Sequence, residues 1–360
     1  MAAAARPESL GPGAEAMAPR IAVLPGDGIG REVVPEAVAI LEGLRLGLEF
    51  EFFDVDADRY LRTGVALPPE IFRRVEQADA IFLGAIGDPR VSDAAYQASV
   101  LSYLRTAFDL YANVRPARLL DESLSPLRHP RRLVDLVVLR ENTEGLYAGM
   151  GTRYRPGSER EVAIVHHYNT YAGVTRILEY AFAIARREVC MVDKWNAMPE
   201  SGALWHARFR AIAERYPGIR ARHLMVDAAA AHLVRDPEQF DVIVTENCFG
   251  DILSDLAGEL AGGIGMSPSG NFNPAGRRAL FEPVHGSAPD IAGRGIANPI
   301  AAIRTGGMLL HYLGFKAEAE AVEAAVVAAI RAGERTRDLG GNLSTAEAAA
   351  AIRRHLQRGG

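Results

Sequence analysis

The sequence predicts an α/β protein, in which strands and helices alternate along most of the chain. Short runs rich in β-branched residues recur between residues 21 and 245, and helical patterns separate them. The first run leads into the glycine turn of IAVLPGDGIG, residues 21–30, and a helical pattern follows it. Strands that alternate with helices in this way favour βαβ units.

The elements follow in chain order. Residues 1–19, rich in Ala, Gly and Pro, are predicted to be a disordered tail, with Met17 as an alternative start. The helix after the glycine turn is predicted to end near Leu44. Further strands are predicted at residues 48–53, 80–83, 133–139, 162–167, 189–192, 222–226 and 242–245, and further helices at residues 68–78, 93–109, 170–187, 199–216, 227–235 and 249–262. After residue 263 we expect a long irregular passage, which suggests a binding loop, and then three alanine-rich helices.

Length and composition exclude several classes of protein. A chain of 360 residues with 49% hydrophobic and 24% charged residues is typical of a globular protein and long enough for two lobes. The net charge of −5 gives no reason to expect nucleic acid or an anionic membrane as a partner. No apolar run is long enough to span a bilayer. Cys190 and Cys248 lie far apart, which fits a reducing, cytoplasmic location.

Lysine is rare in this chain. Of the 40 basic residues only Lys194 and Lys316 are lysines, and only lysine can release its proton near neutral pH. Lys194 follows the strand predicted at residues 189–192, and open α/β sheets bind ligands at the carboxyl ends of their strands. Lys194 is therefore a candidate proton acceptor, with a solvated surface lysine as the alternative.

The glycine turn invites comparison with dinucleotide-binding loops. GDGIG does not complete the fingerprint GxGxxG, so the match is poor. The alternatives are a strand-to-helix turn that needs glycine backbone angles, and such a turn beside a ligand.

Asp251 and Asp255 lie four residues apart on the helix predicted at residues 249–262, so both carboxylates project from one face. Two acids without a basic partner repel each other unless they are solvated or bind a cation, and oxygen ligands suit Mg²⁺ or Mn²⁺. Apolar Ile252 and Leu253 between them suggest that the helix is largely covered. The alternative to metal binding is a solvated acidic first turn that favours the helix dipole.

Three arginines flank short segments of defined structure. Arg105 and Arg115 belong to LRTAFDLYANVRP, and Arg140 belongs to VVLRENTEGLY. Arg105 and Arg115 can converge from a helix and the strand after it, and convergent guanidinium groups bind carboxylates through paired hydrogen bonds. Because 38 residues are arginine, a surface role is the alternative for each of them.

Five motifs occur in a characteristic order: LPGDGIG, YANVRP, RENTEGLY, FDVIVTENCFGDILSDL and FEPVHGSAPDIAGRGIANP. In these motifs, and over nearly the whole chain from Ile21, the sequence resembles the β-decarboxylating dehydrogenases. This family comprises isopropylmalate, isocitrate, homoisocitrate and tartrate/D-malate dehydrogenases, and the resemblance is closest to the isopropylmalate branch. It implies the isopropylmalate/isocitrate dehydrogenase-like α/β fold and not the Rossmann arrangement, which accounts for the incomplete glycine fingerprint.

The resemblance implies two domains. The first is discontinuous, lies on the cofactor side and comprises residues 20–109 plus 263–360. The central domain, residues 110–262, carries the dimer interface and a β arm at about residues 148–168 that pairs with a second subunit. The active site is then shared between the subunits of a homodimer.

The resemblance also assigns roles to single residues. Tyr147 matches the general acid, Lys194 the base, and Asp227 a third metal carboxylate beside Asp251 and Asp255. Lys194 and Asp227 match positions that the family donates across the dimer interface. Substrate contacts are implied for Arg105, Arg115, Arg140, Leu101, Ser102 and Asn196. Cofactor contacts are implied for Ile29, His285, Gly286, Ser287, Ala288, Asp290 and Asn298.

The implied reaction is the NAD-dependent and Mg²⁺- or Mn²⁺-dependent oxidative decarboxylation of a 3-substituted (2R)-malate, a small dicarboxylate. Asp290 favours NAD over NADP, because a carboxylate accepts a hydrogen bond from the ribose 2′-hydroxyl and repels a 2′-phosphate. The first choice of substrate is 3-isopropylmalate, which gives 4-methyl-2-oxopentanoate, a step of leucine biosynthesis.

Two residues depart from the isopropylmalate pattern. Leu101 favours an alkyl substituent, whereas Ser102 leaves room for a smaller or more polar group, and Trp195 narrows the pocket. D-malate, tartrate, isocitrate and homoisocitrate are therefore alternative substrates. A non-catalytic regulatory subunit of a hetero-oligomeric dehydrogenase is an alternative of a different class, and the joint presence of the arginines, Tyr147, Lys194 and the three aspartates argues against it.

Overall fold

The computed structural model describes residues 18–93, 95–127, 134–276 and 278–359. The tail predicted for residues 1–19 lies almost entirely outside the described residues. The chain divides into two compact units. Unit 1 comprises Met1–Leu110, Arg118–Leu133 and Gly258–Gly360, and unit 2 comprises Tyr111–Ala117 and Val134–Ala257. The domain boundaries that the resemblance implies stay a prediction.

The strands of unit 1 lie side by side in the order β2-β1-β3-β12-β11. β1 pairs in parallel with β2 and β3, and β12 pairs in parallel with β3 and antiparallel with β11. Every residue of β3, AIFLGA, is buried, which explains its uninterrupted apolar run, because both faces of this strand are covered. The strands are β1 (Arg20–Gly26), β2 (Glu49–Phe52), β3 (Ala80–Ala85), β11 (Pro268–Phe272) and β12 (Ala279–Pro283).

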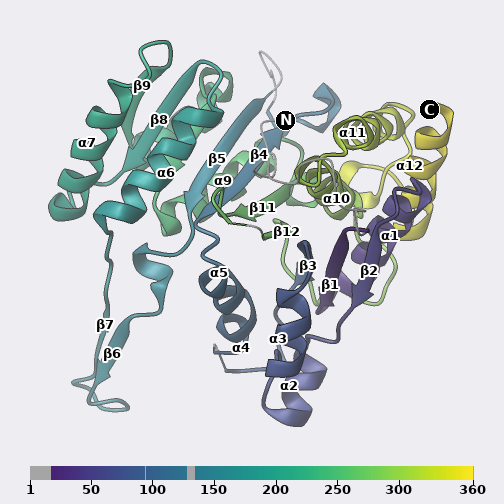
Figure 1. Ribbon diagram of the computed structural model, residues 1–360, viewed down its shortest axis with the longest axis horizontal. Helices are drawn as coiled ribbons and strands as arrows, with labels where there is room; N and C mark the ends of the chain where they lie inside the picture. The colour runs from purple at the N-terminus through teal and green to yellow at the C-terminus, as the bar shows by residue number, and fades with distance from the viewer. Residues whose placement is uncertain (1–17, 94, 128–133, 277, 360) are drawn as a thin grey trace, which may run out of the picture. The chain divides into compact units, whose positions relative to one another are not determined.

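Helices cover the strands of unit 1. The predicted group of three C-terminal helices is confirmed: α11 packs against α10 and α12, and α10 also packs against α1 (Figure 1). Gly306 of α10 lies against Leu41 of α1, where a Cβ would come within 3.1 Å of the leucine side chain, so glycine permits this close approach. The helical segments are α1 (Gly30–Gly43), α2 (Ala57–Thr63), α3 (Pro69–Glu76), α4 (Ala95–Gln97), the π-helix η1 (Ala98–Ser102), α5 (Tyr103–Ala107), η2 (Glu122–Leu124), η5 (Ile264–Met266), α10 (Ile300–Tyr312), α11 (Lys316–Arg331), η6 (Arg337–Leu339) and α12 (Thr345–Gly359).

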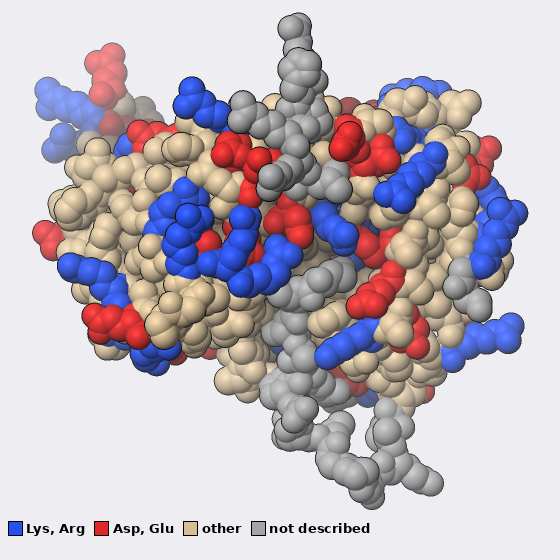
Figure 2. Space-filling model, turned by 90° about the horizontal axis from the view of Figure 1, so that it is seen from above, with Lys and Arg blue, Asp and Glu red and all other residues tan. Residues whose placement is uncertain are grey.

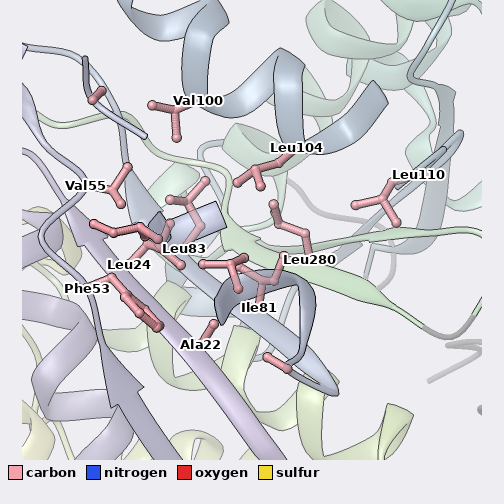
Figure 3. Packing of buried hydrophobic residues seen from close by; sticks show 14 of the residues in the cluster. Ala22, Leu24, Phe53, Val55, Ile81, Leu83, Val100, Leu104, Leu110 and Leu280 are labelled. Carbon is pink, nitrogen blue, oxygen red and sulfur yellow. The ribbon is translucent and has the colours of Figure 1, made fainter. Parts of the chain in front are cut away.

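A cluster of buried apolar side chains ties the strands of unit 1 to the helical segment that carries Arg105. Figure 3 shows Leu24 of β1 and Leu83 of β3 in this cluster, together with Val100 and Leu104 from η1 and α5. All four side chains are fully buried. Because close-packed interiors resist displacement, this cluster holds the segment before Arg105 against β1 and β3.

The irregular passage predicted after residue 263 is confirmed for residues 284–299 and wrong for the part before them. The passage contains the antiparallel pair β11 and β12. Strand β11, PSGNF, is rich in polar residues and therefore lacks the apolar pattern of a strand, although all its residues are buried. Ser269 Oγ donates to the Glu282 carbonyl at 2.7 Å, and Asn271 Nδ2 donates to the Leu280 carbonyl at 3.0 Å. The buried polar groups are thus satisfied, as burial requires.

The strands of unit 2 lie in the order β4-β5-β10-β8-β9. β10 pairs in parallel with β5 and β8, and β8 pairs in parallel with β9. β8 is entirely buried. Asp193 forms its last pair with β9, and Lys194 follows directly after the strand. The strands are β4 (Ala112–Arg118), β5 (Asp135–Glu141), β8 (Glu188–Asp193), β9 (Arg220–Met225) and β10 (Val242–Thr245).

The helices of unit 2 include a packed pair, α6 and α7. A two-stranded hairpin of β6 and β7 extends away from the strands of this unit (Figure 1), and its strand residues are exposed. It falls within the predicted arm, whose pairing with a second subunit stays a prediction. The remaining elements are η3 (Gly145–Ala148), β6 (Gly151–Tyr154), β7 (Val162–Val165), α6 (Tyr171–Ile184), α7 (Pro199–Ala213), α8 (Val226–Arg235), η4 (Pro237–Gln239) and α9 (Asn247–Leu260).

Arginine–carboxylate pairs lie at the amino ends of the unit 2 strands. Arg222 contacts Glu188 at 2.8 Å, and Arg186 contacts Asp135 at 2.9 Å and Asp241 at 3.1 Å. Figure 2 shows a face of the molecule on which blue Lys and Arg side chains gather with red Asp and Glu side chains beside them. Part of the arginine excess is thus used in ion pairs within the chain.

The predicted strands and helices are largely confirmed, with shifts at their ends. The helix predicted at residues 93–109 is interrupted by the π-turn of η1. The strand predicted at residues 222–226 ends at Met225, because Val226 begins α8. Helix α2 has no counterpart in the prediction, although Asp56 caps it by accepting from the Arg59 N–H. Among the described residues, no helix is both long and apolar enough to cross a membrane.

Candidate active site

Arg115 and Arg140 reach the acidic face of α9 from strands β4 and β5. Arg115 Nη1 lies 3.2 Å from Asp251 Oδ1 and 3.2 Å from Asp255 Oδ1. Arg140 Nη1 donates a short hydrogen bond to Asp251 Oδ1. We call these four residues the arginine–aspartate cluster. The two acids therefore have basic partners, which the local sequence does not reveal because they lie more than 100 positions away.

The position of the acids on α9 excludes the dipole alternative. The helix begins at Asn247, so Asp251 and Asp255 lie beyond its first turn, where the effect of the dipole fades. The expectation that the helix is largely covered is confirmed, since only Ile252, Asp255 and Glu259 of its fourteen residues are exposed. Leu253 is buried, but Ile252 is 58% exposed and Asp255 is exposed, so one side of the helix stays open to a ligand.

Neighbouring groups hold the arginine–aspartate cluster in place. Arg115 Nη1 donates to Ser254 Oγ at 2.8 Å, and Arg140 Nε donates to Asn247 Oδ1 at 2.9 Å. A Cβ at Gly250 would lie 2.6 Å from the side chain of Arg140, so glycine at this position lets β5 approach the helix. Arg115 and Arg140 are both buried, which reduces the screening of their charges by water.

Tyr147 joins this cluster from η3. The Arg140 guanidinium lies over its ring at 5.6 Å from the centroid. The Cys248 sulfur and Tyr147 Oη share a hydrogen bond of 3.6 Å. This hydrogen bond and partial burial raise the pKa of Tyr147 to about 12. The phenol therefore keeps its proton through the neutral range, as a general acid requires.

Lys194 and Asp227 form a separate pair in unit 2. Lys194 Nζ lies 2.9 Å from Asp227 Oδ2, and this contact lowers the pKa of the exposed Asp227 carboxyl. Asn196, two residues after Lys194, is exposed. Within the described part of one chain, Asp227 does not join Asp251 and Asp255 in a group of three ligands. The structure thus brings together two of the three predicted metal carboxylates.

The glycine turn in unit 1, Gly26–Gly30, contacts the loop of the FEPVHGSAP motif through the backbone. The Ile29 N–H donates to the Ser287 carbonyl at 2.8 Å. Gly28 has φ +54°, and a Cβ there would lie 1.9 Å from the Ser287 carbonyl oxygen. We call this pair of segments the glycine loop. Only glycine fits at residue 28, which supports the alternative of a turn beside a binding loop.

Asp27, which the sequence patterns do not single out, organises the glycine loop. Its buried carboxylate accepts from the Ala57 N–H at 2.8 Å, the Gly87 N–H at 2.7 Å and the Tyr96 hydroxyl at 2.6 Å. Burial and this last bond raise the pKa of Tyr96. An aspartate between two glycines at a strand end was the available signal, because such a side chain can reach neighbouring loop N–H groups.

The predicted cofactor residues of unit 1 differ in how they are held. His285 is buried, and Nδ1 contacts the Gly286 carbonyl at 2.9 Å, whereas Nε2 has no hydrogen-bond partner among the described residues. Burial lowers the pKa of His285, which favours the neutral ring. Asn298 donates to Asp338 at 2.8 Å and accepts from the Ile300 N–H. Gly286 and Asp290 are exposed, and Ala288 adopts φ +39°.

The predicted specificity residues lie on an irregular turn of helix. Leu101 and Ser102 end the π-helix η1, and such turns frequently occur at functional sites. Leu101 is half-buried and Ser102 is exposed. Arg105 follows in α5 and is held by Glu282 Oε1 at 2.7 Å, while its Nε has no hydrogen-bond partner among the described residues. A buried guanidinium N–H without a partner can still donate a hydrogen bond to an oxygen atom of a ligand.

Residues 20–352 match the family described as isocitrate/isopropylmalate dehydrogenase. The chain belongs to this family. The β-decarboxylating dehydrogenases named from the sequence are thus confirmed as its relatives, and the fold class is confirmed with them. Because the match spans both compact units, it covers the glycine loop as well as the arginine–aspartate cluster.

The individual proteins to which this chain is similar are named as dehydrogenases of this family. The chain is 45% identical over 333 residues to a 3-isopropylmalate dehydrogenase of Corynebacterium jeikeium, covering 91% of this chain and 97% of the relative. Among solved structures it is similar to an isocitrate dehydrogenase from Methylococcus capsulatus, with 37% identity, a TM-score of 0.88 and coverage of 94% and 99%. It is also similar to a beta-decarboxylating dehydrogenase from Thermococcus kodakarensis, with 37% identity, a TM-score of 0.77 and coverage of 94% of this chain and 96% of that chain.

Proposed function

We propose that this enzyme catalyses the NAD-dependent and Mg²⁺- or Mn²⁺-dependent oxidative decarboxylation of 3-isopropylmalate to 4-methyl-2-oxopentanoate. The observation that carries the proposal is the convergence of Arg115 and Arg140 on Asp251 and Asp255, in a chain 45% identical to a 3-isopropylmalate dehydrogenase over 91% of its length. The expected setting is leucine biosynthesis in the cytoplasm.

The substrate is a dicarboxylate, and the arginines supply the matching charge. Arg105, Arg115 and Arg140 bind its carboxylates, because buried guanidinium groups form strong, directional hydrogen bonds with such anions. Asn196 adds a polar contact beside the substrate. Leu101 contacts the isopropyl group from η1, and Ser102 leaves additional space there. A hydrophobic pocket discriminates between substrates that differ by one methylene by only about 1–3 kcal/mol of transition-state binding energy. Related malates should therefore be assayed side by side.

The residues present fit a divalent metal. Asp251 and Asp255 both direct an oxygen to the same Arg115 nitrogen, so their carboxylates converge, and an oxygen-only set suits Mg²⁺ or Mn²⁺. These two residues and Asp227 would hold the ion. When bound, it supplies a Lewis acid that acidifies the C2 hydroxyl and stabilises negative charge on that oxygen. Asp227 would come from the second subunit of a homodimer.

The residues of unit 1 also fit a dinucleotide. His285, whose Nε2 is open, and the exposed Gly286 belong to the glycine loop, and Ile29, Ser287, Ala288 and Asn298 would add further contacts. When bound, the nicotinamide supplies the hydride acceptor. The exposed Asp290 accepts from the ribose hydroxyls, which favours NAD over NADP.

Two side chains move the protons. Lys194 takes the C2 hydroxyl proton as hydride leaves C2, and the product is a ketone β to a carboxylate. This β-keto acid loses CO₂, and the electron pair of the broken bond forms an enolate. Tyr147, whose pKa is raised to about 12, then donates its proton to C3. Lys194 acts in the site of the partner subunit, together with Asp227.

NADH formation tests this proposal directly. We expect turnover of 3-isopropylmalate with NAD and Mg²⁺, and slower turnover of D-malate, tartrate, isocitrate and homoisocitrate. Faster turnover of one of those acids would make it the preferred substrate and leave the proposed reaction unchanged. Equal rates with NADP would contradict the role of Asp290. If no acid is oxidised while the chain binds a homologous partner, the regulatory-subunit alternative replaces the proposal.

A further inference from the structure

Asp193, His206 and His223 form a compact cluster in unit 2 that the proposed reaction does not use. Asp193 ends β8, His223 lies in β9 and His206 lies in the middle of α7. In the β8–β9 pairing His223 is opposite Met191 and Asp193 is opposite Met225. Because side chains alternate along a strand, Asp193 and His223 point to the same face, where His206 meets them.

The ligand atoms of this cluster lie at distances that suit a small ion. His223 Nε2 is 2.8 Å from Asp193 Oδ1, and His206 Nε2 is 3.2 Å from Asp193 Oδ2. One ligand atom from each residue lies within 4.8 Å of the other two. In a tetrahedral site with metal–nitrogen bonds near 2.0–2.1 Å, neighbouring ligand atoms lie about 3.3 Å apart. Both contacts are shorter than this value, so the ligands would move only slightly apart to admit an ion.

Part of the cluster is unsatisfied without an ion. Asp193 Oδ2 and His206 Nε2 are both buried and have no hydrogen-bond partner among the described residues, although they face each other. The Asp193 side chain is only 8% exposed. The two atoms make only a charge contact of 3.2 Å with each other, which a shared cation would replace with two metal–ligand bonds.

Surrounding groups hold the ligands in position. The His206 and His223 rings lie edge to face, with 4.3 Å between their centroids, and the Trp195 ring lies 5.0 Å from that of His206. The Trp195 N–H donates to Asp193 Oδ1 at 3.3 Å. A Cβ at Gly202, one turn before His206, would lie 2.2 Å from Trp195 Cβ, so glycine allows Trp195 to pack on α7. Supporting contacts of this kind orient ligands in metal sites.

We propose that Asp193, His206 and His223 bind a transition-metal ion of the Zn²⁺ class, in a site distinct from the carboxylates that would hold Mg²⁺. Two imidazoles and one carboxylate select zinc, cobalt or nickel over Mg²⁺, which prefers oxygen ligands. Three protein ligands leave a fourth position for water. The ion ties β9 and α7 to the end of β8, one residue before Lys194.

Zinc titration of the full-length protein tests the site. The protein is stripped with a chelator and titrated with Zn²⁺ in excess Mg²⁺, which occupies the oxygen-only site, against a chromophoric competitor. We expect one equivalent of Zn²⁺ per chain. His206→Gln and His223→Gln should each weaken binding by more than about tenfold, since loss of a mere supporting contact already costs 10–100-fold. The matched control is His232→Gln, a half-buried histidine of α8 outside the cluster, which should bind as the parent does.

Cobalt spectroscopy of the unaltered protein gives a second test that does not depend on variants. Co²⁺ in a four-coordinate nitrogen and oxygen site absorbs strongly in the visible range, whereas six-coordinate Co²⁺ on carboxylates and water absorbs weakly. Strong absorption that Zn²⁺ displaces supports the site. Weak absorption, the absence of a stoichiometric zinc equivalent, or unchanged zinc affinity in either histidine variant would overturn it.

Discussion

The glycine loop of unit 1 is joined by backbone contacts, whereas the arginine–aspartate cluster of unit 2 is joined by side-chain contacts. In the glycine loop the contact between the two segments is made by the backbone, as between Ile29 and Ser287. In the arginine–aspartate cluster they are made by side chains, as between Arg115 and Asp255. A backbone-built region depends on which residue is glycine, whereas a side-chain-built region depends on charge. Substitutions should therefore damage the two regions in different ways.

The largest effect is expected for Lys194→Arg, which retains the positive charge but removes a group that can release its proton near neutral pH. Under the proposed mechanism kcat should fall by about 10²–10⁴-fold, the usual contribution of acid–base catalysis. Steady-state NADH formation measures this loss. Lys316→Arg, at the start of α11, is the matched control and should leave kcat unchanged. Full activity of the Lys194 variant would mean that another group is the base.

Asp255→Asn tests the charge dependence of the arginine–aspartate cluster. Removal of one carboxylate should raise the Mg²⁺ concentration for half-maximal activity by about 10–100-fold, the range seen when groups that support a metal are lost. The melting temperature should change little, because the Asp255 side chain is 55% exposed. Glu259→Gln, an exposed acid one turn later on α9, is the control. An unchanged metal requirement would contradict a metal site at Asp255.

Gly28→Ala tests the backbone-built region. The added methyl group would meet the Ser287 carbonyl at 1.9 Å, and the left-handed φ of +54° adds strain. We expect a loss of about 1–3 kcal/mol in the free energy of unfolding, together with a higher KM for NAD. Gly43→Ala is the control, since nothing lies within 4 Å of a Cβ there, and it should be neutral or stabilising. Equal behaviour of the two variants would refute the packing argument.

The smallest effect concerns the acidity of Tyr147. Its pKa is raised to about 12 chiefly by the hydrogen bond that it shares with Cys248, so Cys248→Ala should move the pKa down towards the ordinary value. A raised pKa favours the protonated phenol, so its contribution to stability is complete below the ordinary pKa and is lost as pH rises through about 12. Ultraviolet titration of tyrosinate, compared with Tyr147→Phe, measures the shift. An unchanged titration would remove Cys248 from the explanation.

The sequence predicted much of the fold because its signals are local. Apolar runs such as β3 and the alanine-rich pattern of α10 to α12 are visible within a few turns of chain. Strand β11 was missed because buried Ser269 and Asn271 look like loop residues until their hydrogen-bond partners are known. The candidate site was predicted from motifs, whereas Asp27 was missed because its three partners come from distant parts of the chain.

The sequence by itself determined the alternation of strands and helices, the family, and the residues that the proposed reaction needs. Only the tertiary structure decided which charges meet. Arg115 lies 136 positions from Asp251, and His223 lies 30 positions from Asp193, so strand order and register bring them together. The physical reason is that ion pairs and ligand sets depend on distances of a few ångström in space, while sequence patterns record only the neighbours along the chain.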